Sequence, residues 1–270
     1  RRYDSLCREL ISGTGVWVSD PAVNFVTATI TDDSAGRPDL PKLAGRTSRA
    51  FLGMRLDCLQ CHDDALGTID LSFAGMPREA LQTDFHQFAA FYSQANISLG
   101  GVQDDHRHYA YTYLGDEEVT LIPPKVPFQS DLKLPAGSRR WQLASWITDR
   151  QNRAFSRTAV NRVWAIIFGK PLVDPVDDIP LLGPFPPGLE LLATDFSDHG
   201  YDLKRLIQII TRLDVFRISS RAVFEVTSQH EQAWAVFPLV RLRPEQVAGG
   251  IGQTARVRTI NADVSYSVRQ

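Results

Sequence analysis

The spacing of apolar residues along the chain predicts a protein built mainly from α-helices. Residues 1–13 place apolar side chains at helical intervals and predict a first helix. A second helix is predicted over residues 47–61, where Thr47 or Ser48 can act as the N-cap. A third is predicted over residues 81–92, with one apolar stripe made by Leu81, Phe85, Phe88, Ala89 and Tyr92.

The second half of the chain shows the same period. Over residues 155–168 apolar side chains recur at helical intervals, and Gly169 ends the pattern. Two shorter stripes predict helices around residues 189–196 and 203–213. Apolar stripes of this kind usually form core, so the expected fold class is mainly α.

Residues 93–138 keep no sustained helical period. Alternating side chains predict a small β-hairpin turned at Gly115-Asp116, with Tyr109, Tyr111 and Tyr113 on one strand and Val119 and Leu121 on the other. A run of prolines follows and indicates a linker, which places a domain boundary near residue 124. We therefore expect a small helical module over residues 1–124 and a second helical domain over residues 125–270.

Composition and charge narrow the functional classes. The hydrophobic fraction is 43% and the charged fraction 22%, as in ordinary soluble globular proteins. A net charge of -2 lacks the basic excess that phosphate neutralisation needs, so no nucleic-acid partner is expected. No apolar run reaches the roughly 18 residues of a membrane helix. The chain opens without an apolar signal region, so any export signal is expected to lie outside it.

The cysteines supply the most specific chemical signal. The chain has three cysteines, and two of them lie in the sequence Cys58-Leu59-Gln60-Cys61-His62. This is the spacing of a c-type haem attachment site, because two thiols about one helical turn apart can add to the two vinyl groups of one porphyrin. The histidine that follows then reaches the iron as the proximal ligand. The motif predicts one covalent haem c held by Cys58 and Cys61 and ligated by His62.

Three other interpretations of the motif stay open. A zinc site would need further ligands, and His106-Arg107-His108 is the nearby candidate, although no second cysteine pair exists. A redox-active cysteine pair should follow a strand, which the preceding segment does not resemble. A local disulfide loop or idle cysteines form the third alternative.

Candidates for the sixth iron position come from the flanking sequence. Met76 precedes a proline and the aromatic helix predicted over residues 81–92, the order found in small cytochromes c, so it is a candidate iron ligand. The alternatives are a core-filling methionine or an open position. His86 is expected at the surface or behind the iron ligands, while His106 and His108 lie in a polar loop that could reach the iron. If Met76 does not bind the iron, these three histidines are the other candidate ligands.

Longer segments around these residues resemble a known family. Residues 51–62 and 85–92 resemble the cytochrome-c-like domain of large secreted planctomycete proteins. The second half is similar to the planctomycete-specific helical domain that usually follows it; the matching segments are Arg139–Ile147, Asn161–Trp164, Phe168-Gly169, Pro175–Asp178 and His199–Ile207. The resemblance implies export, haem attachment at Cys58 and Cys61, and ligation by His62, without supplying a substrate. Asp63-Asp64-Ala65-Leu66 departs from the family pattern directly after the motif.

A polar set in the second half invites a structural interpretation. Asn161 and Arg162 lie inside an apolar helix, where buried polar groups need partners. The nearest candidate is a proline-bounded acidic loop, which we expect to clamp against this helix through Arg157 or Arg162 more than to bind a cation. The loop carboxylates are Asp174, Asp177 and Asp178.

Together these features predict a c-type haem protein that transfers single electrons outside the cytoplasm, in the periplasm or after secretion, with an unidentified redox partner protein. Two alternatives from other classes remain. One is an exported scaffold or interaction module without functional haem. The other is a haem-assisted or cation-assisted enzyme acting on an extracellular polymer.

Overall fold

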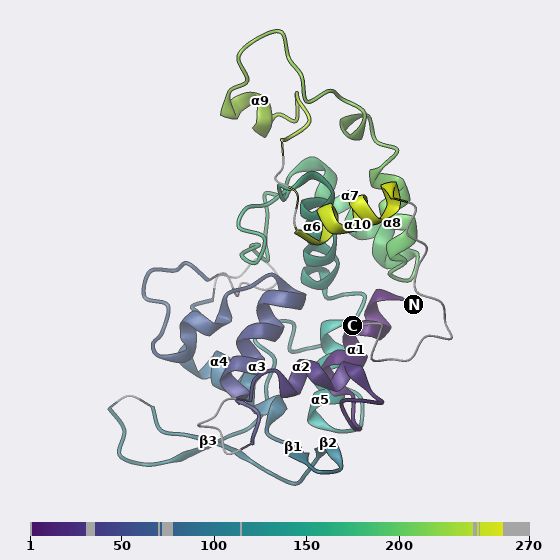
Figure 1. The fold of residues 1–270 in the computed structure, drawn as a ribbon. Coiled ribbons are helices and arrows are strands. Elements are labelled where there is room, and N and C mark those ends of the chain that lie inside the picture. The colour runs from purple at the N-terminus through teal and green to yellow at the C-terminus, as the bar shows by residue number, and fades with distance from the viewer. Residues whose placement is uncertain are drawn as a thin grey trace. The chain divides into compact units, whose positions relative to one another are not determined.

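The computed structural model describes residues 2–30, 36–69, 71, 78–113, 115–239, 242 and 244–255, and it confirms the mainly helical class. This described part contains ten α-helices and two small antiparallel hairpins (Figure 1). The chain divides into two compact units, Arg1–Arg217 and Ile218–Gln270. A boundary near residue 124 stays a prediction. Among the helices described, none has the length and apolar character to cross a membrane.

The first part of the larger unit is a series of short helices. They are α1 (Tyr3–Ser12), η1 (Pro21–Val23), α2 (Asn24–Thr27), α3 (Leu40–Thr47), the π-turn η3 (Ser48–Leu52), the 3₁₀ helix η4 (Leu56–Gln60), α4 (Gln82–Ala89) and η5 (Ala90–Tyr92). Helix α1 and the aromatic helix made by α4 and η5 confirm two of the predicted helices. Helix α3 packs against η3, η4 and α4, which places these elements around the cysteine motif.

The helix predicted over residues 47–61 is wrong. Helix α3 begins earlier because the Asp39 side chain caps it, accepting a hydrogen bond from the Lys42 amide at 2.9 Å. The helical path then ends at Gly53, whose φ of 63° is left-handed and favours glycine. Space also demands glycine there, since a Cβ would lie 2.6 Å from Thr158 Oγ1. The motif therefore lies on a separate short helix, η4.

The sequence predicted one of the two hairpins. Strand β3 (Tyr109–Tyr111) pairs with β4 (Thr120–Ile122), which confirms the predicted hairpin. Strand β1 (Ala95–Ser98) pairs with β2 (Gly101–Asp104) through a two-residue turn, and the sequence did not predict this hairpin. Strands of four residues contain too few alternations to be recognised by period.

The second half of the chain is helical. It contains α5 (Arg139–Ile147), α6 (Arg153–Phe168), α7 (Pro187–Asp198), α8 (Leu203–Ile210) and η6 (Asp214–Phe216), while the smaller unit contains α9 (Ser228–Gln232) and α10 (Pro244–Thr254). Gly169 ends α6 with a φ of 70°, as predicted. The predicted helices are confirmed here, with α8 ending before Leu213.

The core of the larger unit joins distant parts of the chain. Helix α1 packs against α5, and the Tyr3 ring stacks on Phe155 with their centroids 5.4 Å apart. Cys7 is fully buried on the same helix and acts there as a small core residue. Helix α6 contacts η3 and α7, which brings the second half of the chain to the segment that precedes the motif.

The polar pair inside α6 holds the loop that follows it. Asn161 is fully buried, and its side-chain oxygen accepts hydrogen bonds from the amides of Leu172 and Val173 at 2.8 and 3.0 Å. Its amide nitrogen donates to the Val173 carbonyl at 2.8 Å. The expected clamp between helix and loop is therefore confirmed for Asn161. The expected ion pairs with Arg157 or Arg162 are wrong, because Arg157 pairs with Glu190 and Arg162 donates to the Arg49 carbonyl.

A buried arginine ties three elements of the larger unit together. The Arg140 side chain is fully buried, and its Nε donates to Asp104 Oδ1 of β2 at 2.6 Å. Its Nη1 donates to the carbonyl oxygens of Ile11 and Gly13 at the end of α1, at 3.2 and 2.9 Å. A buried charge needs such partners, because desolvation without them costs several kcal/mol. Arg140 thus fixes α1 and β2 to α5.

Replacing Arg140 with methionine keeps much of the side-chain volume but removes the donors. The Asp104 carboxylate and two carbonyls then lose their partner, so the free energy of unfolding should fall by about 3–5 kcal/mol. Urea denaturation followed by circular dichroism measures the loss. Arg37→Met is the matched control, since Arg37 is exposed, and it should change stability by less than about 0.5 kcal/mol. Equal effects in both variants would contradict this role for Arg140.

Candidate functional site

The two motif cysteines are exposed on a short helix. Cys58 lies within η4 and Cys61 follows its last residue, so the side chains are about one turn apart. Both thiols are free and exposed, in contrast to the buried Cys7. The arrangement leaves both sulfur atoms open to a reaction partner that approaches from solvent.

The histidine of the motif has one ring nitrogen engaged. His62 is exposed, and its Nδ1 lies 2.8 Å from the carbonyl oxygen of Asp63. A carbonyl oxygen only accepts hydrogen bonds, so Nδ1 carries the proton and Nε2 keeps its lone pair. This is the tautomer in which Nε2 can ligate a metal while the other nitrogen fixes the ring.

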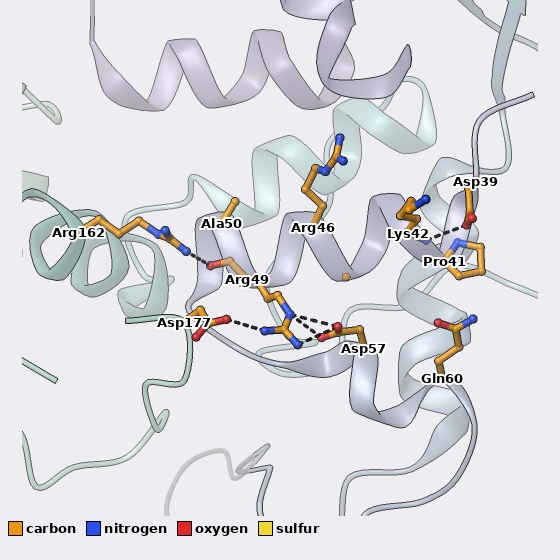
Figure 2. A pocket seen from close by; sticks show the side chains of 11 residues that line it. Asp39, Pro41, Lys42, Arg46, Arg49, Ala50, Asp57, Gln60, Arg162 and Asp177 are labelled. Carbon is orange, nitrogen blue, oxygen red and sulfur yellow. Dashed lines mark hydrogen bonds and ion pairs between the residues drawn. The ribbon is translucent and has the colours of Figure 1, made fainter. Parts of the chain in front are cut away.

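The motif helix rests on α3 at a glycine. A Cβ on Gly45 would lie 2.8 Å from the Cβ of Asp57, closer than real side chains approach. Glycine therefore allows η4 to pack directly on α3. Arg49 strengthens the contact, since its Nε donates to both carboxylate oxygens of Asp57, at 2.9 and 3.1 Å (Figure 2).

The same arginine connects the motif to the acidic loop. Arg49 Nη1 donates to Asp177 at 2.5 Å, and Arg55 Nη2 donates to the other oxygen of that carboxylate at 2.8 Å (Figure 2 shows the Arg49 contacts). The hydrogen bond from Arg55 is the largest of the interactions that hold the pKa of Asp177 below its usual value, and Arg49 adds to it. Desolvation of the carboxylate partly opposes this effect. Asp177, not Asp174 or Asp178, is thus the loop carboxylate that anchors the motif region.

A cavity of about 640 Å³ lies beside this ion-pair cluster. Its lining includes four cations and three carboxylates, together with Gln60 of the motif; the charged residues are Asp39, Lys42, Arg46, Arg49, Asp57, Arg162 and Asp177 (Figure 2). Arg49 and Arg55 together balance the charges of Asp57 and Asp177. Lys42 and Arg46 carry no ion pair in the described part of the chain, so the cavity has a cationic wall next to the motif.

Three donors converge on one backbone oxygen inside the motif. The Gln60 carbonyl accepts hydrogen bonds from Gln82 Nε2 at 2.9 Å, His86 Nε2 at 3.1 Å and the Tyr111 hydroxyl at 3.5 Å. Each such bond adds about 1 kcal/mol net to stability. Because Gln60 lies between the two cysteines, these contacts fix the backbone that presents both thiols.

His86 is buried, which excludes a place at the surface and leaves its place behind the iron ligands as a prediction. Its Nε2 donates to the Gln60 carbonyl, which leaves Nδ1 to accept the Tyr109 hydroxyl hydrogen at 2.8 Å. Its ring stacks on Tyr111 with centroids 3.6 Å apart. Both ring nitrogens are therefore engaged, and His86 supports the motif backbone in this arrangement.

The residues directly after the motif hold its exit. The Asp63 carboxylate accepts the Gln82 amide hydrogen at 2.7 Å, which caps α4. Asp64 is buried and accepts hydrogen bonds from Thr68 Oγ1 and from the Ile69 amide. Asp63 and Asp64 thus order the loop that follows His62.

Of the remaining candidate iron ligands, His106 and His108 belong to the described residues and Met76 does not. His106 and His108 are exposed between β2 and β3 and make no hydrogen bond to the motif among the described residues. Met76 lies outside the described residues. Within those residues, no group of three or more histidine, cysteine or acidic side chains is placed to hold a metal ion.

Several contacts around the motif have no signature in the sequence. Gly45 and Asp57 meet from different helices, and the acceptor of Gln82 is a backbone atom, so neither contact has a sequence signature. The alternating tyrosines did predict a hairpin, but nothing in that pattern indicates that Tyr109 and Tyr111 contact His86.

Comparison with known proteins gives a family match for part of the chain. Residues 139–257 match the model of the PSD1 family, described as a protein of unknown function (DUF1553). No family model of a cytochrome c matches. No curated protein and no solved structure is significantly similar to this chain. The matched residues include α5 to α8 and the loop that carries Asp177, whereas the cysteine motif precedes them.

Gly45→Ala should separate the motif helix from α3. Alanine favours a helix by about 1 kcal/mol, but the contact with Asp57 should cost more, so we expect a net loss of about 1–2 kcal/mol in stability. Thermal unfolding measures this loss, and the rate of thiol labelling reports the disturbed motif. Gly188→Ala is the control, because its Cβ would meet no atom within 4 Å, and this variant should be at least as stable as the parent. A Gly45→Ala protein of unchanged stability would show that the helices are further apart.

Buried His86 should make stability depend on pH. Desolvation lowers its pKa, and the hydrogen bond to Gln60 only partly opposes this effect. Below the unfolded value of about 6.5 the unfolded chain binds a proton that the folded protein resists, so stability should fall as pH drops from about 7 towards 5. Chemical denaturation at several pH values measures the slope.

His86→Gln should reduce that slope, because glutamine does not titrate. The exposed His108→Gln is the matched control and should leave the slope unchanged. An identical slope in the parent and in His86→Gln would assign the pH dependence to other groups.

Proposed function

We propose that the protein carries one covalent haem c on Cys58 and Cys61, with His62 as the proximal iron ligand, and that it transfers single electrons outside the cytoplasm. The observation that carries this proposal is the combination of two free, exposed thiols one turn apart with a His62 ring whose Nε2 keeps its lone pair. A buried or disulfide-bonded pair would have argued against it.

The attachment is an addition reaction, so its atoms balance with the two thiols and the two vinyl groups of the porphyrin. Each thiol would add across one vinyl group: a carbon–sulfur bond would form, the thiol proton would move to the neighbouring vinyl carbon, and no group would leave. The haem would supply one-electron iron chemistry, tuned by the axial ligands and by shielding from water. The chain's own residues hold the two sulfur atoms and the imidazole in place.

The surroundings of the motif suit that role. Asp63 orients the His62 ring through its carbonyl, and the three donors on Gln60 hold the backbone between the sulfur atoms. The cationic wall made by Lys42 and Arg46 offers partners for the carboxylates that haem carries. Met76 is proposed as the sixth ligand, with His106, His108 or an open position as alternatives.

The cellular context is part of the same proposal. Covalent haem c is attached outside the cytoplasm, so the protein would act in the periplasm or after secretion, with a redox partner protein of unknown identity. Residues 139–257, similar to the PSD1 family, would contribute the loop carboxylate Asp177 that braces Arg49 and Arg55.

Expression in a strain competent for cytochrome c maturation tests the proposal. The reduced protein should show a sharp α-band that survives acid-acetone extraction, because thioether links keep haem on the chain. The double variant Cys58→Ala/Cys61→Ala should lose that band. Cys7→Ala is the matched control and should keep it, since Cys7 is buried away from solvent. A folded parent protein without haem, or haem that acid-acetone removes, would contradict the proposal.

The sixth ligand is tested on the same material. Methionine ligation gives the oxidised protein a weak long-wavelength charge-transfer band, which Met76→Ala should abolish while covalent haem remains. If the band is absent from the parent, or persists in Met76→Ala, Met76 is not the ligand.

A further inference from the structure

A second cavity, of about 510 Å³, lies in the larger unit and uses none of the motif residues. Its walls come from α1, residues 132–135, the first half of the region similar to PSD1, and Tyr201. Cavities of this size commonly accept a small organic ligand. What it would bind follows from the side chains that line it.

Aromatic side chains form one wall. Trp141 is 41% exposed, which is unusual for the largest apolar side chain in a folded protein. Trp146 and Tyr201 line the same cavity but are only 2% exposed each. The wall therefore combines one exposed indole side chain with two buried aromatic residues.

Two hydrogen-bond donors in that wall have no acceptor. Trp146 Nε1 and the Tyr201 hydroxyl are buried and make no hydrogen bond within the described residues. Burial raises the pKa of Tyr201 to about 12, so the hydroxyl keeps its proton. Because neither atom is accessible to solvent, both lie beneath the wall, and the groups that a ligand in the cavity would meet are those of the exposed side chains.

The other wall is charged, with more cations than carboxylates. Arg2 and Arg8 both pair with Asp4, at 3.0 and 3.5 Å, so that carboxylate is already neutralised. Lys133 is exposed and has no partner in the described part of the chain, and Asp149 keeps one carboxylate oxygen that accepts no hydrogen bond there. The cavity thus combines excess positive charge with a hydroxyl-binding carboxylate.

We propose that this cavity binds an acidic sugar, that is, a pyranose that carries a carboxylate. The C–H face of a pyranose ring is flat and apolar and can stack on the indole of Trp141. Its carboxylate suits the cationic wall, and its hydroxyl groups can donate to Asp149. A neutral sugar would leave the cations unused, and an aromatic acid has no hydroxyl groups for Asp149.

Titration of the full chain with D-glucuronate, followed by isothermal calorimetry and tryptophan fluorescence, tests this assignment. Glucuronate should bind with a dissociation constant near 1 mM, and neutral glucose at least about tenfold more weakly. Trp141→Ala should weaken glucuronate binding by about tenfold or more, and Lys133→Ala by a few-fold.

Trp17→Ala is the matched control, because Trp17 is 42% exposed and does not line the cavity. It should bind glucuronate within about twofold of the parent. Circular dichroism confirms that the variants fold. The proposal is overturned if glucuronate fails to bind at about 20 mM, if glucose binds equally well, or if Trp17→Ala is as damaging as Trp141→Ala. Tighter binding of benzoate than of glucuronate would replace the acidic sugar with an aromatic acid.

Discussion

A five-residue 3₁₀ helix has almost no stability of its own, and the candidate site is built on one. Such a helix makes few internal hydrogen bonds, and these have poor geometry. The motif helix η4 therefore keeps its shape only because neighbouring elements hold it. Gly45 allows η4 to pack closely on α3, Arg49 donates hydrogen bonds to Asp57, and three donors bind the carbonyl of Gln60.

These supports come from distant parts of the chain. The α3 contacts precede the motif, Gln82 and His86 follow it, and Tyr109 and Tyr111 belong to a hairpin further on. Asp177, in the loop after α6, accepts a hydrogen bond from Arg55, which lies 122 residues earlier in the sequence. The result is a fixed backbone below two thiols that remain open to solvent. A rigid base with exposed reactive groups is what attachment of a large planar cofactor requires, since the sulfur atoms must keep their spacing while the partner approaches.

The two proposed sites of the larger unit differ in the chemistry of their side chains. The motif region combines sulfur, imidazole and a cationic wall, and its supports are mostly backbone contacts and ion pairs. The second cavity is aromatic on one side and charged on the other, with two donors left without acceptors. Buried Arg140 supports the second cavity, because it fixes α5, which carries Trp141 and Trp146, to the end of α1. If both proposals hold, one chain joins electron transfer to the recognition of an acidic sugar.

Local signals in the sequence determined the helical class, the positions of five of the ten described α-helices, the hairpin at Tyr109 and the pentapeptide with its reactive groups. They are local because a helical period, a glycine stop or a CxxCH spacing involves residues within a few turns of one another. Tertiary structure alone decided that the helix before the motif breaks at Gly53, that His86 is buried beneath the Gln60 carbonyl, and that Asp177 pairs with Arg49 and Arg55. Each of these depends on which elements pack together, since burial and ion pairing are properties of neighbours in space, and the sequence by itself does not say which neighbours those are.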